Sequence, residues 1–355
     1  MKFLIKLMFY FLNSNFIKIN VLIFQKNKTL LKNIIVRKYS KQDINLWNSY
    51  VKSSKNGTFL HNRNFMDYHC DRFEDFSMIV SENEKLIAVL PANISNHILY
   101  SHQGLSYGGI LFDEKIKLEK VILIFQTILK FLSENKIDIF HIKTIPSIYH
   151  KKPAEEINYA LFLTNAKLVR CDSLSILDLS KNNKIASGRL EGIKKAKKFN
   201  LHIKEENNLD SFWNEILVPN LQTKFNTNPV HNLEEITKLK KHFPENIRQF
   251  NVYQNDKLVA GTTIFETETV AHAQYISGNE SKSEIGSVDF LYHYLITDIF
   301  KNKQFFDFGT SNEQQGRKLN SGLNFWKESF GASTIVQNFY EVETKNFDLL
   351  DNILI

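Results

Sequence analysis

The chain has 355 residues, more than one hydrophobic core usually organises, so we expect two domains of ordinary size. Hydrophobic residues make up 43% of it and charged residues 23%, which excludes a largely disordered or fibrous protein. The formal charge of +7 comes from lysines spread along the chain, which indicates a solvated basic surface and no DNA partner, with a localised anion site as the alternative. Cys70 and Cys171 are too few for a disulfide framework, so we expect a reducing, cytoplasmic compartment.

The first segment, 1–33, is set apart by an apolar run over 1–24. Lys6 and Lys18 interrupt the run, no small-residue cleavage site follows it, and a membrane span needs about 20 apolar residues. We expect an extension outside the fold, disordered or arising from a misassigned start, with peripheral membrane contact as the alternative. The folded part is expected to begin near Ile34.

A long-period repeat organises the remaining chain. Residues 79–95 read IVSENEKLIAVLPANIS and residues 251–267 read NVYQNDKLVAGTTIFET. In both segments a polar turn separates two β-type runs, which is a hairpin signal. The chain therefore contains two diverged copies of one unit.

Each hairpin is followed by a strand, a glycine-containing loop, a helix and another strand. We expect strands at 98–103, 137–142 and 174–179 in the first half and at 270–277, 304–309 and 333–340 in the second, with helices over 121–132 and 288–299. This order predicts an α/β fold with a mixed sheet in each half. The predicted domains are 34–180 and 201–345, joined by a basic linker and first helix over 181–200 and followed by a tail over 346–355.

Two segments of the second half carry candidate chemistry. The loop ending at Gly286 and Ser287 enters a helix, so its free amides and the helix dipole suit a pyrophosphate, although Ser287 is equally a plain N-cap. Asp307 on an apolar strand is either structural or catalytic, and Gly309 allows a close backbone approach. Lys318 is able to hold a phosphate oxygen, although a loop cation is more often solvated.

In the first half, His102 is able to accept a proton near neutral pH, and Arg63 is able to bind an acidic group. The alternative for His102 is an ordinary hydrogen-bonding residue beside a turn. The alternative for Arg63 is a place in an amphipathic connecting segment. The chain has none of the HExxH, GxSxG, paired CxxC or dinucleotide-binding motifs, and its Asp, Glu and His residues are scattered. We therefore expect no metal.

Three segments resemble the FemAB-related branch of the GNAT acyltransferase superfamily, whose members carry two GNAT-like domains in tandem. They are RLEGIKKAKKF at 189–199, the strand, loop and helix at 270–302, and the run from DFG to GLNFWKESFG at 307–331, and the likeness extends over about 34–340. It implies transfer of amino acids from aminoacyl-tRNA to peptidoglycan precursors, or acyl-CoA-dependent acylation of amino sugars and related amines.

The peptidoglycan enzymes of this branch commonly carry a long helical arm, and no segment between Gly188 and Gln249 has the length or heptad pattern for one. We therefore favour an acyl-CoA-dependent N-acyltransferase that acts on an amino sugar or nucleotide-linked sugar of surface-polysaccharide assembly. An aminoacyl-tRNA-dependent ligase and a binding protein without activity are the alternatives.

The resemblance also implies where the substrates lie. Acyl-CoA is expected in the second half, with its thioester between the strands that end at Ser277 and Gly309, near Gly286, Ser287, Thr310 and Asn320. Asp307 and His102 are the candidate bases. An anionic amine or sugar acceptor is expected in a cleft between the halves, at a set of cationic and hydrogen-bonding residues: Arg63, His102, Tyr107, Lys194, Lys195 and Lys318.

Overall fold

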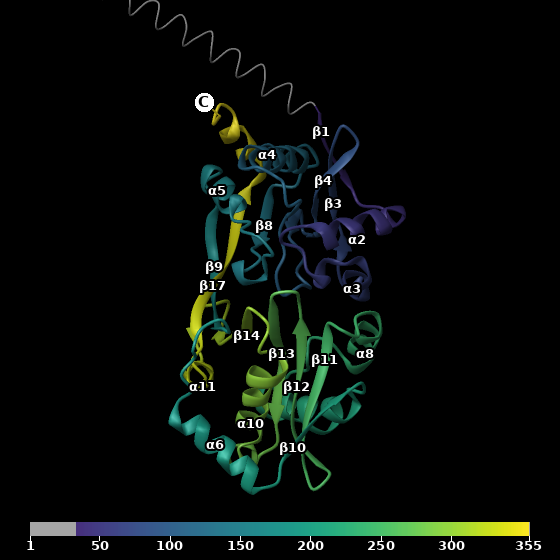
Figure 1. Ribbon diagram of the computed structural model, residues 1–355. Helices are drawn as coiled ribbons and strands as arrows, with labels where there is room; N and C mark the ends of the chain where they lie inside the picture. The colour runs from purple at the N-terminus through teal and green to yellow at the C-terminus, as the bar shows by residue number, and fades with distance from the viewer. Residues whose placement is uncertain (1–32, 355) are drawn as a thin grey trace, which may run out of the picture.

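The structure is a computed structural model that describes residues 33–354. Figure 1 shows two lobes placed end to end, with α4 and β8 in the first and α10 and β12 in the second. The expected extension over 1–33 lies outside the described residues except for Asn33. No helix within the described residues has the length and apolar character needed to cross a membrane.

The first lobe is built from residues that precede the basic segment. Its helices and strands are β1 (Ile34–Lys38), α2 (Ile44–Ser53), α3 (Arg63–Met66), β2 (Glu74–Asp75), β3 (Met78–Glu82), β4 (Lys85–Leu90), β5 (Asn93–Ser95), β6 (Ile98–Tyr100), β7 (Leu111–Phe112), α4 (Leu118–Glu134), β8 (Ile139–Lys143), the short η4 (Ser147–Tyr149), α5 (Glu156–Leu163) and β9 (Lys167–Asp178).

The second lobe repeats the order of hairpin, strand, helix and strand. Its elements are α6 (Ser187–Lys198), β10 (His202–Glu206), the π-helical η5 (Phe212–Leu217), α7 (Val218–Phe225), α8 (Leu233–His242), β11 (Ile247–Gln254), β12 (Lys257–Glu266), β13 (Val270–Gly278), α9 (Lys282–Ile285), α10 (Ser287–Tyr294), β14 (Phe305–Thr310), β15 (Asn312–Glu313), β16 (Lys318–Leu319), α11 (Ser321–Glu328) and β17 (Ser333–Glu343).

The two predicted hairpins are confirmed, as β3–β4 and β11–β12. Their tips use residues with positive φ, Asn83 and Glu84 in one and Asn255 and Asp256 in the other. Two consecutive positive φ angles give the turn whose twist matches that of the flanking strands. The polar tips therefore set the register of both hairpins.

The copies differ in how their hairpins join the rest of the sheet. In the second lobe β11, β12, β13 and β14 are consecutive strands of an 11-stranded sheet, whereas in the first lobe β1, β3, β4 and β7 form a separate 4-stranded sheet. The two lobes nevertheless share one feature, a parallel pair of strands: β6 with β8 in the first lobe and β13 with β14 in the second. The mixed sheet that the sequence predicts is thus present in both copies.

Two long strands belong to both lobes, as Figure 1 shows along one side of the molecule. The C-terminal part of β9 pairs with β14 of the second lobe, while the C-terminal part of β17 pairs with β8 of the first. Between them β9 and β17 pair along most of their length. The sheet order β13-β14-β9-β17-β8 therefore joins the lobes into one sheet.

A hydrophobic cluster also crosses the junction between the lobes. It combines buried residues of the first lobe, including Trp47, Phe65 and Tyr149, with Trp213 and Phe265 of the second. Each lobe has a further cluster of its own, one beneath α4 and one beneath α10. Because apolar burial is the main favourable term in folding, the junction contributes to the stability of both lobes.

The C-terminal residues return to the first lobe. The turn Thr344–Leu350 packs on α4, where Gln126 Nε2 donates to the carbonyl oxygen of Phe347 at 3.2 Å. Leu350 is buried in the cluster of the first lobe. The expected tail, as far as residue 354, thus belongs to that lobe.

Candidate functional site

Strands β13 and β14 begin as a parallel pair and then separate. They pair only from Val270 with Phe305 to His272 with Asp307. Just beyond this point β13 has a bulge against β12, since Ala273 and Tyr275 oppose consecutive residues and Gln274 is the extra residue. Because a bulge bends its strand, the pairing of β13 with β14 ends at His272, and we call the unpaired part between the two strands the gap.

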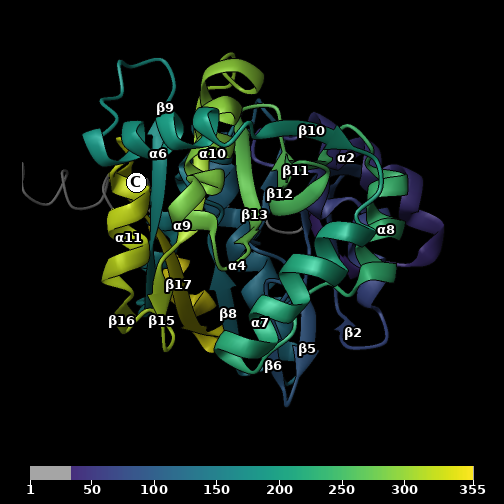
Figure 2. The same ribbon diagram turned by 90° about the horizontal axis from the view of Figure 1, so that it is seen from below.

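A cavity of about 500 Å³ lies at the far end of β13. Ile276, Ser277 and Gly278 form one side of it, and residues of α6, α7, α10 and α11 form the others. Figure 2 shows α6 lying along α9 and α10. Its lining combines apolar side chains such as Leu221 and Trp326 with four cations: Arg189, Lys195, Lys224 and Lys282.

The cations of this cavity are poorly neutralised. Arg189 pairs with Asp289 at 2.7 Å, but no ion pair within residues 33–354 involves Lys195, Lys224 or Lys282. Burial, and next the neighbouring Lys224, lower the pKa of Lys282. Two like charges side by side raise each other's energy, so an anion placed between them is stabilised.

Ser277 lines this cavity, whereas Gly286 is outside its lining. The Oγ of Ser277 accepts a hydrogen bond from Asn220 Nδ2 at 2.8 Å. Gly286 has a φ of +70°, and a Cβ atom there would lie 2.0 Å from the carbonyl oxygen of Gly192 in α6. The need for glycine at 286 is therefore explained by the packing of α6, a contact within the chain that the sequence interpretation did not foresee.

Ser287 is fully buried, and its Oγ has no hydrogen-bond partner among the described residues. Thr310 and Asn320, which were also predicted to bind acyl-CoA, are outside the cavity lining. Asn320 Oδ1 caps α11 by accepting from Leu323 N at 3.0 Å, and Thr310 Oγ1 donates to Asn312 Oδ1 at 2.9 Å. Lys318 is exposed on β16. These three residues therefore shape the β14–α11 loop and do not contact the cavity.

Asp307 is 1% exposed and accepts three hydrogen bonds. Tyr149 of the first lobe donates to its Oδ2 at 2.6 Å, His272 Nδ1 lies 2.9 Å from the same oxygen, and Gly309 N donates to Oδ1 at 2.6 Å. Burial raises the pKa of Asp307, but His272 and the hydrogen bonds outweigh it and hold the pKa below its usual value. The candidate base is thus an enclosed carboxylate without an open side toward a substrate.

His272 was not among the predicted site residues. Its side chain is 18% exposed and stands at the point where β13 and β14 separate. The signal that could have found it is the alternation of polar residues in VAHAQYISG, where a histidine interrupts an apolar strand. Its partnership with Asp307 joins residues 35 positions apart and was not visible in the sequence.

Lys327 is a second residue that the sequence interpretation missed. It is buried, and its Nζ donates to the carbonyl oxygens of Gly309 at 2.9 Å and Thr310 at 2.7 Å. Burial lowers its pKa to about 8. These bonds hold the left-handed Gly309, whose φ is +73°, and so fix the end of β14 beside His272.

The first-lobe candidates do not face an open cleft. Arg63 is buried, and its guanidinium contacts Asp67 at 2.5 Å and Asp75 at 2.7 Å, so its charge is already neutralised. Tyr107 is buried, and its hydroxyl donates to Thr58 Oγ1 at 3.1 Å. These contacts correct the expectation that Arg63 and Tyr107 are free to bind a substrate.

His102 is also buried, and its ring stacks on His69 with the centroids 4.8 Å apart. Burial, and next the neighbouring His69, lower its pKa well below the usual value. Lys194 and Lys195 are exposed on α6, which Figure 1 shows at the end of the second lobe away from the first. The predicted acceptor set is therefore not one site, because its members lie on distant elements.

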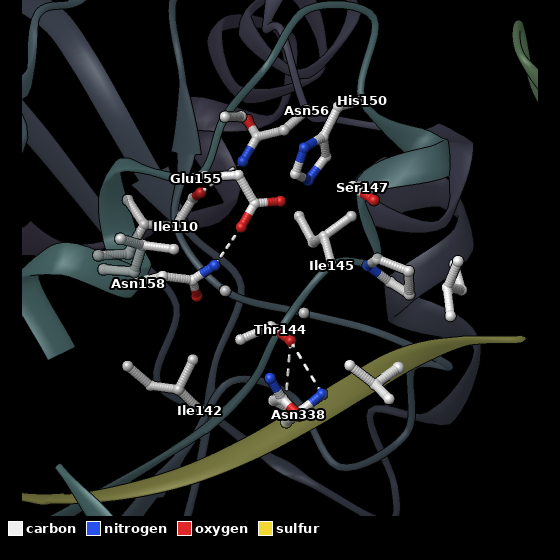
Figure 3. Close-up of a pocket in the computed structure, with 17 residues that line it drawn as sticks. Asn56, Ile110, Ile142, Thr144, Ile145, Ser147, His150, Glu155, Asn158 and Asn338 are labelled. Atoms are coloured by element: carbon white, nitrogen blue, oxygen red, sulfur yellow. Dashed lines mark hydrogen bonds between the residues drawn. The ribbon is translucent and has the colours of Figure 1, made fainter. Parts of the chain in front are cut away.

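The first lobe has a cavity of its own, which Figure 3 shows, beside β8, the counterpart of β14. It has a volume of about 340 Å³ and lies between the end of β8, α5 and β17. Its lining contains His150 and Glu155 but no lysine or arginine, and burial lowers the pKa of His150 to about 4, so the imidazole is neutral at pH 7. Of these two cavities, the second-lobe cavity therefore has cations in its lining and the first-lobe cavity has none.

A third cavity, of about 530 Å³, lies at the junction of the lobes. Residues of the first lobe, including Thr58 and Tyr149, face Asn246, Thr267 and Glu268 of the second across it. The junction is thus packed at its centre and hollowed at its rim.

Within residues 33–354 no three His, Cys, Asp or Glu side chains group as a metal site.

Comparison with known proteins gives structural likeness only. No protein-family model and no curated protein sequence matches the chain. The structure is similar to FemX, with a TM-score of 0.61 and 10% identity over 89% of this chain and 99% of FemX. It is also similar to L-PGS from Bacillus licheniformis, with a TM-score of 0.55 and 13% identity over 89% of this chain and 95% of that one.

A further similar structure is the C-terminal domain of a protein from Agrobacterium fabrum described as a lysylphosphatidylglycerol synthetase. Its TM-score is 0.56, with 12% identity over 87% of this chain and 95% of that domain. All three likenesses run over nearly the whole of both chains, so they include both lobes and their arrangement. The chain therefore shares the two-lobed fold of FemX and L-PGS, which is the kind of fold that its motifs predict.

Proposed function

We propose that the chain is a cytoplasmic N-acyltransferase that takes an acyl group from acyl-CoA, acetyl-CoA first, and transfers it to an amine. The acceptor proposed is an amino sugar or nucleotide-linked sugar of surface-polysaccharide or cell-envelope assembly. The observation that carries the proposal is the cation-lined cavity at the end of β13, next to the gap between β13 and β14.

The cavity suits the two kinds of surface that CoA presents. Its phosphates need cations and free donors, which Lys195, Lys224 and Lys282 supply. Its adenine and pantetheine arm suit apolar walls such as Leu221 and Trp326. The first-lobe cavity, which has no cation in its lining, suits this donor less well.

In the reaction, the amine nitrogen attacks the thioester carbonyl, a C–N bond forms and the C–S bond breaks. The thiolate of CoA leaves, and the amine loses one proton. Donors aimed at the developing oxyanion would lower the barrier, and we propose for this role the backbone amides of β13 beyond His272, where pairing with β14 has ended.

Aminoacyl-tRNA is the second donor to test, because its 3′ end is also an acyl ester on a phosphate-bearing adenosine. A similar structure carries the name of an enzyme whose product is an aminoacylated lipid, lysylphosphatidylglycerol. Against this donor, α6, α7 and α8 are separate helices of 12, 8 and 10 residues, and none forms a long arm between Gly188 and Gln249.

Isothermal titration of the full chain with acetyl-CoA, longer acyl-CoAs, free CoA and charged tRNA tests the proposal. We expect acyl-CoA and CoA to bind and charged tRNA to bind no better than uncharged tRNA. Binding of charged tRNA alone would replace the donor by aminoacyl-tRNA. Binding of none of them would leave the chain as a binding protein of the same fold and overturn the proposal.

The cations of the cavity give a quantitative prediction. Lys224→Ala and Lys282→Ala are each expected to weaken acetyl-CoA binding by about tenfold or more, since a charge-assisted hydrogen bond contributes roughly 1.5–3 kcal/mol. Added salt should weaken wild-type binding in the same direction. Lys194→Ala is the matched control, because Lys194 is exposed on α6 outside the cavity lining. Equal affinities in all four proteins would contradict the assignment of the donor to this cavity.

A further inference from the structure

We infer that His272 is the proton acceptor for the attacking amine, oriented by Asp307 and Tyr149. This role rests on the proposed function and adds to it the catalytic group that the acyl transfer needs. The observation behind it is the chain of hydrogen bonds from Tyr149 and His272 to one buried carboxylate, placed where β13 and β14 part.

The position of His272 is the first step of the argument. His272 pairs with Asp307 as the last pair before the strands separate, and Gln274 forms the bulge two residues later. Its side chain therefore belongs to the narrow end of the gap, while the cation-lined cavity opens at the other end of the same strand, at Ile276–Gly278. A donor held by its phosphates in that cavity has its acyl end directed along β13 toward His272.

The hydrogen bonds set which nitrogen is basic. Asp307 Oδ2 lies 2.9 Å from His272 Nδ1, and the pKa of Asp307 is held below its usual value, so the carboxylate is charged and accepts a hydrogen bond from Nδ1–H. The tautomer with hydrogen on Nδ1 leaves the lone pair on Nε2. A base held by a third group in this way matches the geometry of known acid–base sites.

The carboxylate itself is firmly held. Burial and Asp307 raise the pKa of Tyr149 well above its usual value, so its hydroxyl keeps its proton and donates a hydrogen bond to Oδ2. Gly309 N donates to Oδ1, and Lys327 holds the carbonyl oxygen of Gly309. Asp307 is thus a positioning residue, with each oxygen occupied.

Access separates His272 from three buried histidines of the first lobe. Its side chain is 18% exposed, whereas His61, His69 and His102 are all buried. Gly309 lies against the ring edge, since a Cβ atom there would be only 3.3 Å from His272 Cε1. The glycine therefore keeps the side of the imidazole next to Nε2 free of a neighbouring side chain.

In the step proposed, the amine nitrogen bonds to the thioester carbon as its proton passes to His272 Nε2. The imidazolium so formed is stabilised by charged Asp307. The proton then goes to the leaving thiolate of CoA, so the histidine ends neutral and the products are an amide and CoA thiol. No metal or oxidant is needed.

Chemical footprinting of the full chain tests whether His272 faces the donor. Diethyl pyrocarbonate modifies accessible neutral imidazoles, and peptide mass spectrometry locates the product. We expect His272 to be modified in the free protein and protected by saturating acetyl-CoA, while exposed His242 is modified equally in both samples. If calorimetry shows that acetyl-CoA binds but His272 is unmodified or unprotected, the role of His272 is overturned. If acetyl-CoA does not bind, the proposed function falls instead, and this role with it.

His272→Asn separates chemistry from structure, because an Asn amide is able to replace the Nδ1 donor to Asp307 but offers no Nε2. We expect an unchanged melting temperature and acetyl-CoA affinity, and CoA release with glucosamine or hydroxylamine slowed by about 100-fold or more. Tyr149→Phe should reduce the rate less and shift the pH–rate profile, which a purely structural contact would leave in place. Full activity of His272→Asn would overturn the inference, as would an equal loss of binding and rate.

Discussion

Lowering the pH from 7 to 5 is expected to reduce the free energy of unfolding, and two histidines at the junction of the lobes account for about 4 kcal/mol of that loss. Burial lowers the pKa of His61 to about 3, and burial followed by the nearby charges of His69 and Arg72 lowers that of His231 to about 3. Both side chains are buried in the folded protein. Their ordinary pKa in an unfolded chain is about 6.5.

The sign of the effect follows from which state binds the proton. Below pH 6.5 the unfolded chain takes up a proton on each histidine, while the folded chain does so only near pH 3, so stability falls as the pH falls between these values. From pH 6.5 to pH 5 is about 1.5 pH units, and each unit costs about 1.36 kcal/mol per histidine. Each histidine therefore lowers the free energy of unfolding by about 2 kcal/mol at pH 5. For a domain whose stability is about 5–15 kcal/mol, the combined loss is large.

Urea denaturation at pH 7, 6 and 5 measures this loss. His61→Asn is the informative variant, because its Oδ1 is able to replace His61 Nδ1 as the acceptor for Thr58 N, a bond of 3.1 Å, without titrating. Its stability should fall by about 2 kcal/mol less than that of the wild type between pH 7 and 5. His242→Asn, at an exposed histidine of α8, should keep the wild-type slope. A wild-type stability independent of pH in this range would contradict the argument.

Local pattern was enough to predict the hairpins, the paired strands and the duplicated order of elements. The tip residues Asn83 and Asn255 lie between alternating strands, so their turns depend on neighbours that are adjacent in sequence. The tandem fold then followed from the order of three motifs, and its likeness to FemX confirms it. Periodicity is informative here because each hairpin closes within a few residues.

Local sequence pattern could not predict that β9 pairs with a strand of the second lobe and β17 with a strand of the first. Both segments were predicted as strands, but which strand each one pairs with depends on the whole sheet. The same limit applies to the site. Asp307 was singled out as costly to bury, yet its partners His272 and Tyr149 come from other strands and from the other lobe. The structural role of Arg63, by contrast, was visible in the sequence, because Asp67 lies one helical turn away and is able to form an ion pair with it.

Replacing Gly286 by alanine is expected to cost about 3 kcal/mol of stability and to weaken the proposed binding of acetyl-CoA together with it. The residue has a φ of +70°, a conformation that costs an L residue about 1–2 kcal/mol. Its Cβ would lie 2.0 Å from the carbonyl oxygen of Gly192, and backbone cannot move aside as a side-chain tip can. Overpacking of this kind adds about 1–3 kcal/mol.

The binding defect would arise through α6. This helix carries Arg189 and Lys195 of the cation-lined cavity and packs on α9 and α10 through the contact of Gly192 with Gly286. Gly322→Ala in α11 is the matched control: Gly322 is outside the cavity lining, a Cβ there meets only Asn320 Oδ1 at 3.8 Å, and alanine is expected to stabilise the helix by up to about 1 kcal/mol. Thermal denaturation and acetyl-CoA calorimetry on both variants decide the matter. If Gly286→Ala lost CoA affinity at wild-type stability, Gly286 would contact the donor directly; if it lost neither, α6 would not be held by this contact.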